Sequence, residues 1–319
     1  MEKREKIMIK KAIITAAGKG TRQYPATNAV QKELFPLIDR DGIAKPTLQI
    51  IIEEVMRAGI EEIAIIVQPG EEKQFQNHFQ ELSALDKKSF SNKPWGLEQS
   101  NALKKMQQSI TYIHQTEQHG FGHAVYCANG WAGSDPVLLL LGDHVYLSHV
   151  EMSCVQQVIN IYERFHQSVF GVQQTPIDDL YLFGAVAGEQ LDARLGIYQL
   201  DRILEKPTPE MARAQLAIPE LAPEMFLTIF GIYLLTPAIF QILGDHIESN
   251  IRDKGEIQLT TALAELIEHE GTIGYEVAGE RLDMGTPLGY LQTQFRLAQH
   301  SEIRKEFLDF VRKHVSAVD

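Results

Sequence analysis

An α/β fold is predicted for this chain, in which a mostly parallel, mixed central sheet is flanked by helices in a Rossmann-like arrangement. Short aliphatic runs alternate with helical patterns over the first half of the chain. The runs at 63–67 and 137–141 are unbroken, as in strands that are buried on both faces. After about residue 175, apolar runs are separated by turns alone, which adds a small antiparallel portion before C-terminal helices.

The first half of the chain has a β-α-β-α order. Strands are expected at 12–16, 63–67, 110–114, 137–141 and 168–172, and helices at 47–57, 71–79, 124–131 and 151–165. The helix at 47–57 carries its apolar residues on one face and stops at Gly59. Because strand-helix-strand units of this kind form right-handed crossovers, we expect parallel strands with helices on both faces.

The second half has a different pattern. Short strands are expected at 183–186, 195–199 and 202–204, a long strand at 225–235, and helices at 207–214, 257–269, 286–298 and 302–315. The stretch at 87–109 is the most polar of the chain and is interpreted as loop-like. Since no linker separates the halves, we expect them to pack directly on each other.

Composition and charge exclude several kinds of partner. The 30 Lys and Arg and 42 Asp and Glu side chains give a net charge of −12. An acidic surface repels phosphate backbones and anionic lipids, so we expect neither nucleic acid nor membrane as a partner. The two cysteines, Cys127 and Cys154, cannot form a disulfide framework and suit the reducing cytoplasm, where we expect a soluble protein.

A glycine-rich loop, Ala16-Ala17-Gly18-Lys19-Gly20-Thr21-Arg22, follows the first predicted strand. Glycines let the backbone approach a ligand closely, and successive N–H groups can then bind phosphate oxygens. Two familiar phosphate loops are excluded. A Walker A loop needs Ser or Thr after Gly-Lys, whereas Gly20 stands there, and a dinucleotide fingerprint needs a third glycine where Gln23 stands.

Further motifs follow this loop in order. They are Lys32-Glu33-Leu34-Phe35-Pro36, Gln115 with Gly120-Phe121-Gly122-His123-Ala124, Leu141-Gly142-Asp143, Glu205-Lys206-Pro207, Gly255 to Thr260, and Asp283-Met284-Gly285-Thr286-Pro287. From about residue 10 to residue 299, the chain resembles the bacterial UTP–glucose-1-phosphate uridylyltransferases (UDP-glucose pyrophosphorylases), which are sugar-nucleotide nucleotidyltransferases. The resemblance implies the nucleotidyltransferase fold.

It also implies Mg²⁺-dependent transfer of a uridylyl group from UTP to α-D-glucose 1-phosphate, giving UDP-glucose and pyrophosphate. The attack is direct and in line, with no covalent intermediate. A phosphomonoester is mostly dianionic near pH 7, because its second pKa is about 6. The nucleophile therefore needs no general base, in keeping with a sequence that presents no convincing Ser/His/Asp or Cys/His arrangement.

The resemblance assigns roles residue by residue. The cations that act on the phosphates are Arg22, Lys32 and Lys206. The nucleotide-binding residues are Ala17, Gly18, Gly20, Glu33, Gln115 and Gly120, with Gly120 leaving room for the base. The sugar-binding residues are Gly184, Glu205 and Gly231, and the metal ligands are Asp143 and Asp283.

The motifs interleave along the chain, so one nucleotidyltransferase domain is expected at 1–299. Its nucleotide-binding part lies at about 10–175 and its sugar-phosphate part at about 176–285. A C-terminal helix at 300–319 is a possible oligomer contact, and the family resemblance implies a homodimer or tetramer.

Three positions depart from the family pattern: Asn28 replaces a usual Lys, Gln31 a usual Pro, and His144 a usual Asp or Val. They leave two alternatives open. One is a transferase for another pair of nucleoside triphosphate and sugar 1-phosphate, and the other is a non-catalytic homologue that binds a UDP-sugar.

Overall fold

A computed structural model describes residues 8–315; residues 1–7 and 316–319, and with them the end of the helix expected at 300–319, lie outside the described residues. Residues 8–315 contain one sheet of nine strands and two sheets of two strands. Across the large sheet the strands are β5 (Ile110–His114), β4 (Glu62–Val67), β1 (Lys11–Thr15), β6 (Val137–Leu141), β11 (Met225–Leu235), β8 (Ser168–Pro176), β12 (Thr272–Glu276), β10 (Ile197–Glu205) and β9 (Gly184–Asp192).

The sheet is mixed and mostly parallel, as predicted. The pairs β5–β4, β4–β1, β1–β6 and β8–β12 are parallel, whereas β11 and β10 run antiparallel to their neighbours. Within the described chain, seven of the nine strands therefore point the same way. The antiparallel portion expected after residue 175 is confirmed, and its strand β11 lies in the middle of the sheet, between β6 and β8.

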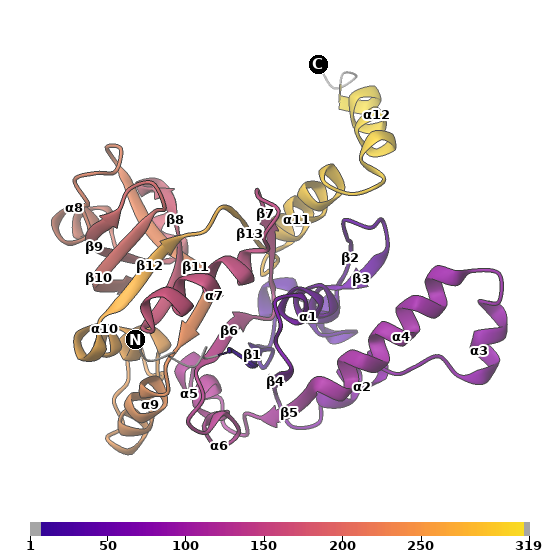
Figure 1. Ribbon diagram of the computed structural model, residues 1–319, viewed down its shortest axis with the longest axis horizontal. Helices are drawn as coiled ribbons and strands as arrows, with labels where there is room; N and C mark the ends of the chain where they lie inside the picture. The colour runs from indigo at the N-terminus through magenta and orange to yellow at the C-terminus, as the bar shows by residue number, and fades with distance from the viewer. Residues whose placement is uncertain (1–7, 316–319) are drawn as a thin grey trace, which may run out of the picture.

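Helices cover both faces of the sheet (Figure 1). One face packs against α1 (Thr47–Arg57), α2 (Glu72–His78) and α7 (Cys154–Phe165). The other packs against α5 (Phe121–Tyr126), α6 (Asn129–Ala132), α8 (Pro209–Gln215), α9 (Ala238–Glu248) and α10 (Leu259–Glu270). Strand β6 faces both layers, because Leu138 and Leu140 belong to the first core and Leu139 to the second.

Most predicted elements are confirmed, and three are corrected. The single helix expected at 124–131 is two short helices, α5 and α6. The strands expected at 195–199 and 202–204 form one strand, β10, with an irregularity between Leu200 and Arg202. The loop expected at 87–109 is largely helix, comprising the second half of α3 (Ala84–Ser89) and all of α4 (Pro94–Ser109).

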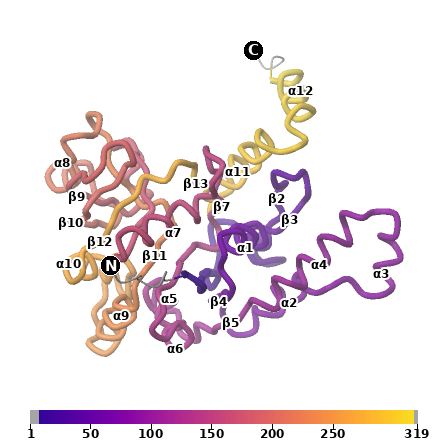
Figure 2. The backbone as a smooth tube through the Cα atoms, in the orientation of Figure 1, coloured from indigo at the N-terminus to yellow at the C-terminus, as the bar shows by residue number. Residues whose placement is uncertain are grey.

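The sequence pattern did not predict helix α4, because the composition of this helix is mostly polar. It begins with Pro94, which is favoured in the first turn, and it contains many good helix formers. Its buried residues are Gly96, Ser100 and Met106, so its apolar periodicity is weak. Figures 1 and 2 show α3 and the N-terminal end of α4 extending away from the sheet.

The C-terminal helices α11 (Pro287–Gln299) and α12 (Arg304–Val315) follow the sheet. Helix α11 packs on a small hairpin of β2 (Pro36–Ile38) and β3 (Ala44–Pro46) and on β13 (Gly279–Asp283). Helix α12 projects from the body in Figure 1 and has no buried side chain among its described residues. Among helices within residues 8–315, none is long and apolar enough to cross a membrane.

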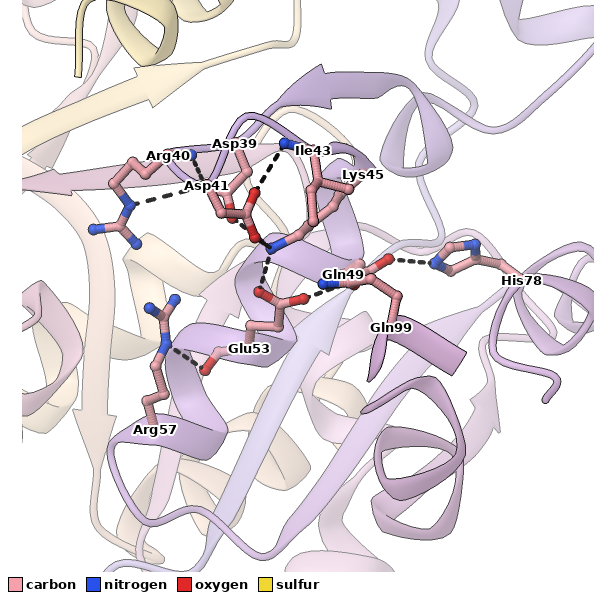
Figure 3. Close-up of polar contacts among 10 residues, drawn as sticks. All are labelled: Asp39, Arg40, Asp41, Ile43, Lys45, Gln49, Glu53, Arg57, His78 and Gln99. Atoms are coloured by element: carbon pink, nitrogen blue, oxygen red, sulfur yellow. Dashed lines mark hydrogen bonds and ion pairs between the residues drawn. The ribbon is translucent and has the colours of Figure 1, made fainter. Parts of the chain in front are cut away.

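A buried polar cluster joins the β2–β3 hairpin to α1 (Figure 3). Lys45, which is 3% exposed, donates from Nζ to Asp39 Oδ2 at 2.9 Å and Glu53 Oε2 at 2.8 Å and pairs with Asp41 Oδ2 at 2.6 Å. The remaining oxygens also accept hydrogen bonds: Asp39 Oδ1 from the Arg40 N–H, Asp41 Oδ1 from the Ile43 N–H, and Glu53 Oε1 from Gln49 Nε2. Each carboxylate is therefore fully bonded within the protein.

Candidate active site

The glycine loop and Asp143 meet at one edge of the sheet. Strands β1 and β6 are parallel and end together at Thr15 and Leu141. The Gly142 N–H donates to the Thr15 carbonyl at 3.0 Å, and a Cβ at Gly142 would lie 2.6 Å from that oxygen. A glycine is therefore required where the two strand ends converge, and it brings Asp143 beside the loop after β1.

A cavity of about 270 Å³ lies at this edge. Seven of the predicted residues line it: Ala17, Gly18, Lys32, Glu33, Gln115, Gly120 and Asp143. Lys32 and Glu33 come from a 3₁₀ turn, η3 (Lys32–Leu34), and Gln115 follows β5. The structure thus assembles segments more than 100 residues apart in the sequence into one cavity.

Lys32 lies between two carboxylates in this cavity. Its Nζ is 2.5 Å from Asp143 Oδ2 and 3.2 Å from Glu33 Oε1. Burial disfavours the charge of Lys32, but the two carboxylates outweigh it and raise the pKa of Lys32. Burial opposes ionisation of Asp143 as well, but the charges of Lys32 and His144 lower the pKa of Asp143.

Glu33 is incompletely bonded. It is 0% exposed, and neither of its carboxylate oxygens has a hydrogen-bond partner among the described residues. Burial, with a contribution from Asp143, raises the pKa of Glu33 to about 7 despite the opposing charge of Lys32. The cavity therefore holds a buried carboxyl group whose Oε1 is ion-paired with Lys32 and whose Oε2 accepts no hydrogen bond.

The Gln115 side chain is held in one orientation. Its Nε2 donates to the Gly120 carbonyl at 3.0 Å and lies 3.2 Å from His123 Nδ1. The opposite orientation would place the amide oxygen against that carbonyl, where two acceptors would repel each other. Burial and the neighbouring His119 lower the pKa of His123, which favours the neutral ring. Gln115 Oε1 is therefore free of these two contacts.

Three residues of the predicted nucleotide site have surroundings that sequence reasoning missed. The Ala17 carbonyl accepts hydrogen bonds from Gln68 Nε2 at 2.8 Å and Gln118 Nε2 at 3.2 Å. Gly20 is absent from the lining of this cavity, and at a φ of 58° a Cβ there would lie 2.8 Å from the Thr27 side chain. The glycine requirement at Gly120 has a cause in the protein itself, because a Cβ would lie 2.8 Å from Glu256 Cβ and the Ile257 carbonyl.

A second cavity, of about 160 Å³, shares Phe121 and Leu141 with the first. It brings together the predicted sugar-binding residues Gly184, Glu205 and Gly231. Glu205 Oε2 accepts a hydrogen bond from Thr260 Oγ1 at 2.8 Å, which fixes the carboxylate in the wall. Gly231 has a φ of 89°, and a Cβ there would lie 2.7 Å from His144 Nδ1.

The two candidate metal ligands are joined by a small sheet. Strand β7 (His144–Ser148) begins directly after Asp143 and pairs antiparallel with β13, which ends at Asp283. His144 Nε2 lies 3.6 Å from Asp283 Oδ1, and the Gly285 N–H donates to that oxygen at 2.6 Å. Burial opposes ionisation of Asp283, but the contact with His144 and the Gly285 N–H lower the pKa of Asp283.

A third cavity, of about 730 Å³, contains the remaining predicted residues Arg22, Lys206 and Asp283. Arg22 lines this cavity, whereas Lys32 lines the first one. Lys206 adopts a left-handed conformation, with a φ of 48°, and its N–H donates to the Phe183 carbonyl at 3.1 Å. Arg281, on β13, lines both this cavity and the second one.

Arg281 and His144 are two cavity residues that sequence reasoning left without a role. The alternation in Gly279-Glu280-Arg281-Leu282-Asp283 places Arg281 on the same face of β13 as Asp283, and this period of two was a usable signal. His144 stood out only as a departure from the family pattern. Burial lowers the pKa of the Arg281 guanidinium.

Comparison with known proteins gives one consistent result. The sequence profile of the nucleotidyl transferase family matches residues 11–300. The UTP–glucose-1-phosphate uridylyltransferase of Bacillus subtilis is 35% identical over 304 residues, covering 95% of this chain and 96% of that protein. The protein of the same name from Staphylococcus haemolyticus is 35% identical over 315 residues, covering 96% and 98%.

Solved structures agree with the sequence relatives. A UDP-glucose pyrophosphorylase complexed with UDP-glucose is 27% identical, with a TM-score of 0.74, over 92% of this chain and 99% of that chain. A UTP-bound UGPase from Acinetobacter baumannii is 26% identical, with a TM-score of 0.77, over 96% and 100%. The likeness extends over nearly the whole length of each chain.

Proposed function

Because the chain belongs to the nucleotidyl transferase family and, within it, to the UTP–glucose-1-phosphate uridylyltransferases, we propose that it transfers a uridylyl group from UTP to α-D-glucose 1-phosphate. The products are UDP-glucose and pyrophosphate. One observation carries the proposal. The nucleotide cavity and the sugar pocket share a wall at Phe121 and Leu141, so substrates bound in the two cavities would meet beside Asp143.

The chemistry is an in-line displacement. A phosphate oxygen of the sugar 1-phosphate forms a bond to the α-phosphorus of UTP, and the bond from that phosphorus to the bridging oxygen of the β-phosphate breaks. The nucleophile is already an anion, so positioning and charge neutralisation are what the protein has to supply. Lys32 neutralises charge at the triphosphate, and Lys206 does so at the sugar phosphate.

Base recognition is assigned to Gln115. Its Nε2 is occupied by Gly120 and His123, so its Oε1 is available to accept the ring N–H of uracil. Cytosine presents an acceptor at the equivalent ring position, which Oε1 would repel. Gly18 and Gly120 line the same cavity as Gln115 and form the rest of the proposed base site.

Mg²⁺ is the proposed cofactor, held by Asp143 and Asp283. The residues fit this ion, because both carboxylates have a lowered pKa, line cavities, and are tied together by the β7–β13 ladder. Mg²⁺ prefers one or two carboxylates, with water and phosphate oxygens in its other positions. When bound, it would neutralise phosphate charge. Within the described residues no group of three or more His, Cys, Asp or Glu could hold a metal ion.

The assay that tests the function measures pyrophosphate release with Mg²⁺ over a matrix of four nucleoside triphosphates and several hexose 1-phosphates. We expect the highest kcat/KM for UTP with glucose 1-phosphate. A clear preference for another pair would replace the substrates and keep the reaction class. Binding of UTP without turnover on any pair would contradict the enzyme and favour a non-catalytic UDP-sugar-binding homologue.

A cytoplasmic homodimer or tetramer is proposed as the working form. Helices α11 and α12 expose large apolar side chains, among them Leu288, Leu291 and Phe310. Monomeric soluble proteins rarely expose large continuous apolar patches, so exposed apolar side chains on these two helices favour a contact with a second copy of the chain. Light scattering after size-exclusion chromatography distinguishes the states, and a mass of 36 kDa at micromolar concentration would contradict the proposal.

A further inference from the structure

Arg281 is a partly buried cation for which the protein supplies no anion. Its guanidinium carbon lies 3.7 Å from the centroid of the Phe183 ring, and its Nη1 donates to the Ile229 carbonyl. No carboxylate among residues 8–315 forms an ion pair with it. Asp283, two residues along β13, attracts it electrostatically from a greater distance.

Its position is at the junction of two cavities. Arg281, Leu182 and Phe183 line both the sugar pocket and the cavity that contains Lys206. Phe183 is a common support, because its ring lies under Arg281 and its carbonyl accepts the Lys206 N–H. Both residues therefore contact Phe183, Arg281 through its guanidinium and Lys206 through its backbone, while Lys206 Nζ lies 3.8 Å from Glu205 Oε1.

A cation in this setting needs a counter-ion. Burial of a charge is costly unless it is paired, and buried arginines in proteins normally meet a carboxylate or a phosphate. A guanidinium has five N–H donors in a fixed fork that matches a phosphate group. One donor of Arg281 is used on a backbone carbonyl, which holds the group in place and leaves the others for a ligand.

We propose that Arg281 binds the phosphate group of the sugar 1-phosphate, together with Lys206, and that the substrate supplies the anion that this guanidinium lacks. The inference rests on the proposed function for the identity of the substrate. It assigns different tasks to the two ends of the sugar 1-phosphate. Glu205, Gly184 and Gly231 face the sugar ring, while Arg281 and Lys206 face its phosphate.

The test compares Arg281→Met, which removes the charge, with Arg281→Lys, which keeps the charge and loses the fork. Arg213→Met is the matched control, because Arg213 pairs with Glu224 on the surface, away from the three cavities. Kinetics give KM for each substrate, and calorimetry gives direct binding of glucose 1-phosphate and of a panel of other hexose 1-phosphates.

We expect Arg281→Met to raise KM for glucose 1-phosphate roughly 10- to 100-fold, with KM for UTP within about twofold and an intermediate effect in Arg281→Lys. Equal changes in both KM values would indicate a merely structural role and overturn the inference. If the wild type has no turnover with this pair, the proposed function fails, and binding then decides. Weaker binding of any hexose 1-phosphate to Arg281→Met supports the inference, whereas equal binding, or none to the wild type, overturns it.

Discussion

Lys45 and Lys32 are both buried among carboxylates, yet their surroundings differ. Around Lys45, every oxygen of Asp39, Asp41 and Glu53 accepts a hydrogen bond or an ion pair from the protein (Figure 3). Around Lys32, Glu33 Oε1 is ion-paired with Lys32, but Glu33 Oε2 has neither an ion pair nor a hydrogen bond, and Asp143 lines an open cavity. The first cluster is complete in itself, and the second is complete only with a ligand.

This difference separates a structural cluster from a functional one without reference to any relative. A fully bonded network rigidifies the place where a hairpin meets a helix. A network with unused acceptors at a cavity is less stable than it could be, and function is the usual reason for keeping it. Substitutions of the two lysines are therefore expected to have opposite consequences for stability and activity.

Lys32→Met is expected to have the largest effect on activity. It removes the cation that neutralises the triphosphate, so kcat falls by roughly 10²- to 10³-fold. The melting temperature falls less than in Lys45→Met, because Glu33 can take up a proton when its cation is lost and Asp143 lines an open cavity. Steady-state kinetics and calorimetric melting of the same preparation measure both. Activity retained within tenfold would contradict the assignment of Lys32.

Lys45→Met is the counterpart on the structural side. It leaves buried Asp39 and its neighbours without a cation, and breaking such a buried pair costs about 3–5 kcal/mol. For a chain of 319 residues this lowers the melting temperature by about 5–8 °C. The kcat of the folded fraction stays close to wild type. A loss of kcat without a loss of stability would reverse the distinction between the clusters.

Glu33 is expected to make the unfolding free energy depend on pH. Its pKa in the folded protein is about 7, above the ordinary value of 4.5, so the folded state holds this proton more tightly than the unfolded chain. The associated stability is fully present below pH 4.5 and is lost as the pH rises through 7. Relative to Glu33→Gln, the wild type is expected to lose on the order of 3 kcal/mol of unfolding free energy over this range.

Denaturant titrations between pH 5 and 8 measure this loss for both proteins. Asp39 is the control, because its pKa is lowered despite its burial by hydrogen bonds and charge from Lys45, which places its titration below this window. Parallel pH profiles for the wild type and Glu33→Gln would contradict the prediction.

The smallest expected effect is on base selection. Gln115→Met keeps the volume of the side chain and removes Oε1, so KM for UTP rises roughly 10-fold and the preference for UTP over CTP falls by a similar factor. His123→Leu, which removes the acceptor beside Nε2, moves the same ratio in the same direction. Competition between UTP and CTP measures it, and an unchanged ratio in both variants would exclude Gln115 from base recognition.

Sequence reasoning located the carboxyl-end site because its signals are local. The glycine loop, the aliphatic strand before Asp143 and the run at Gln115 each carry their meaning in a few residues. Fully buried strands such as β6 and β11 were bounded correctly for the same reason. The apolar residues that form each of these strands, and the residues at which each strand ends, can be read from the local sequence alone.

What sequence reasoning missed depends on packing between distant segments. The setting of Arg281 at the ring of Phe183 arises from contacts across the chain. Helix α4 was taken for a loop because it buries few apolar residues. The Lys45 cluster gave no signal, because the meeting of Lys45, Asp39 and Glu53 depends on how the hairpin lies on α1.

The central place of β11 has a consequence for synthesis of the chain. Strands β5, β4, β1 and β6 lie within the first 141 residues and can pair as soon as they are made, but the free side of β6 waits for residues 225–235. All five residues of β6 are Val or Leu, so the unfinished chain carries an exposed aliphatic sheet edge. Fragments that stop before β11 are therefore expected to aggregate rather than fold, and a nascent chain of that length is a natural client for chaperones.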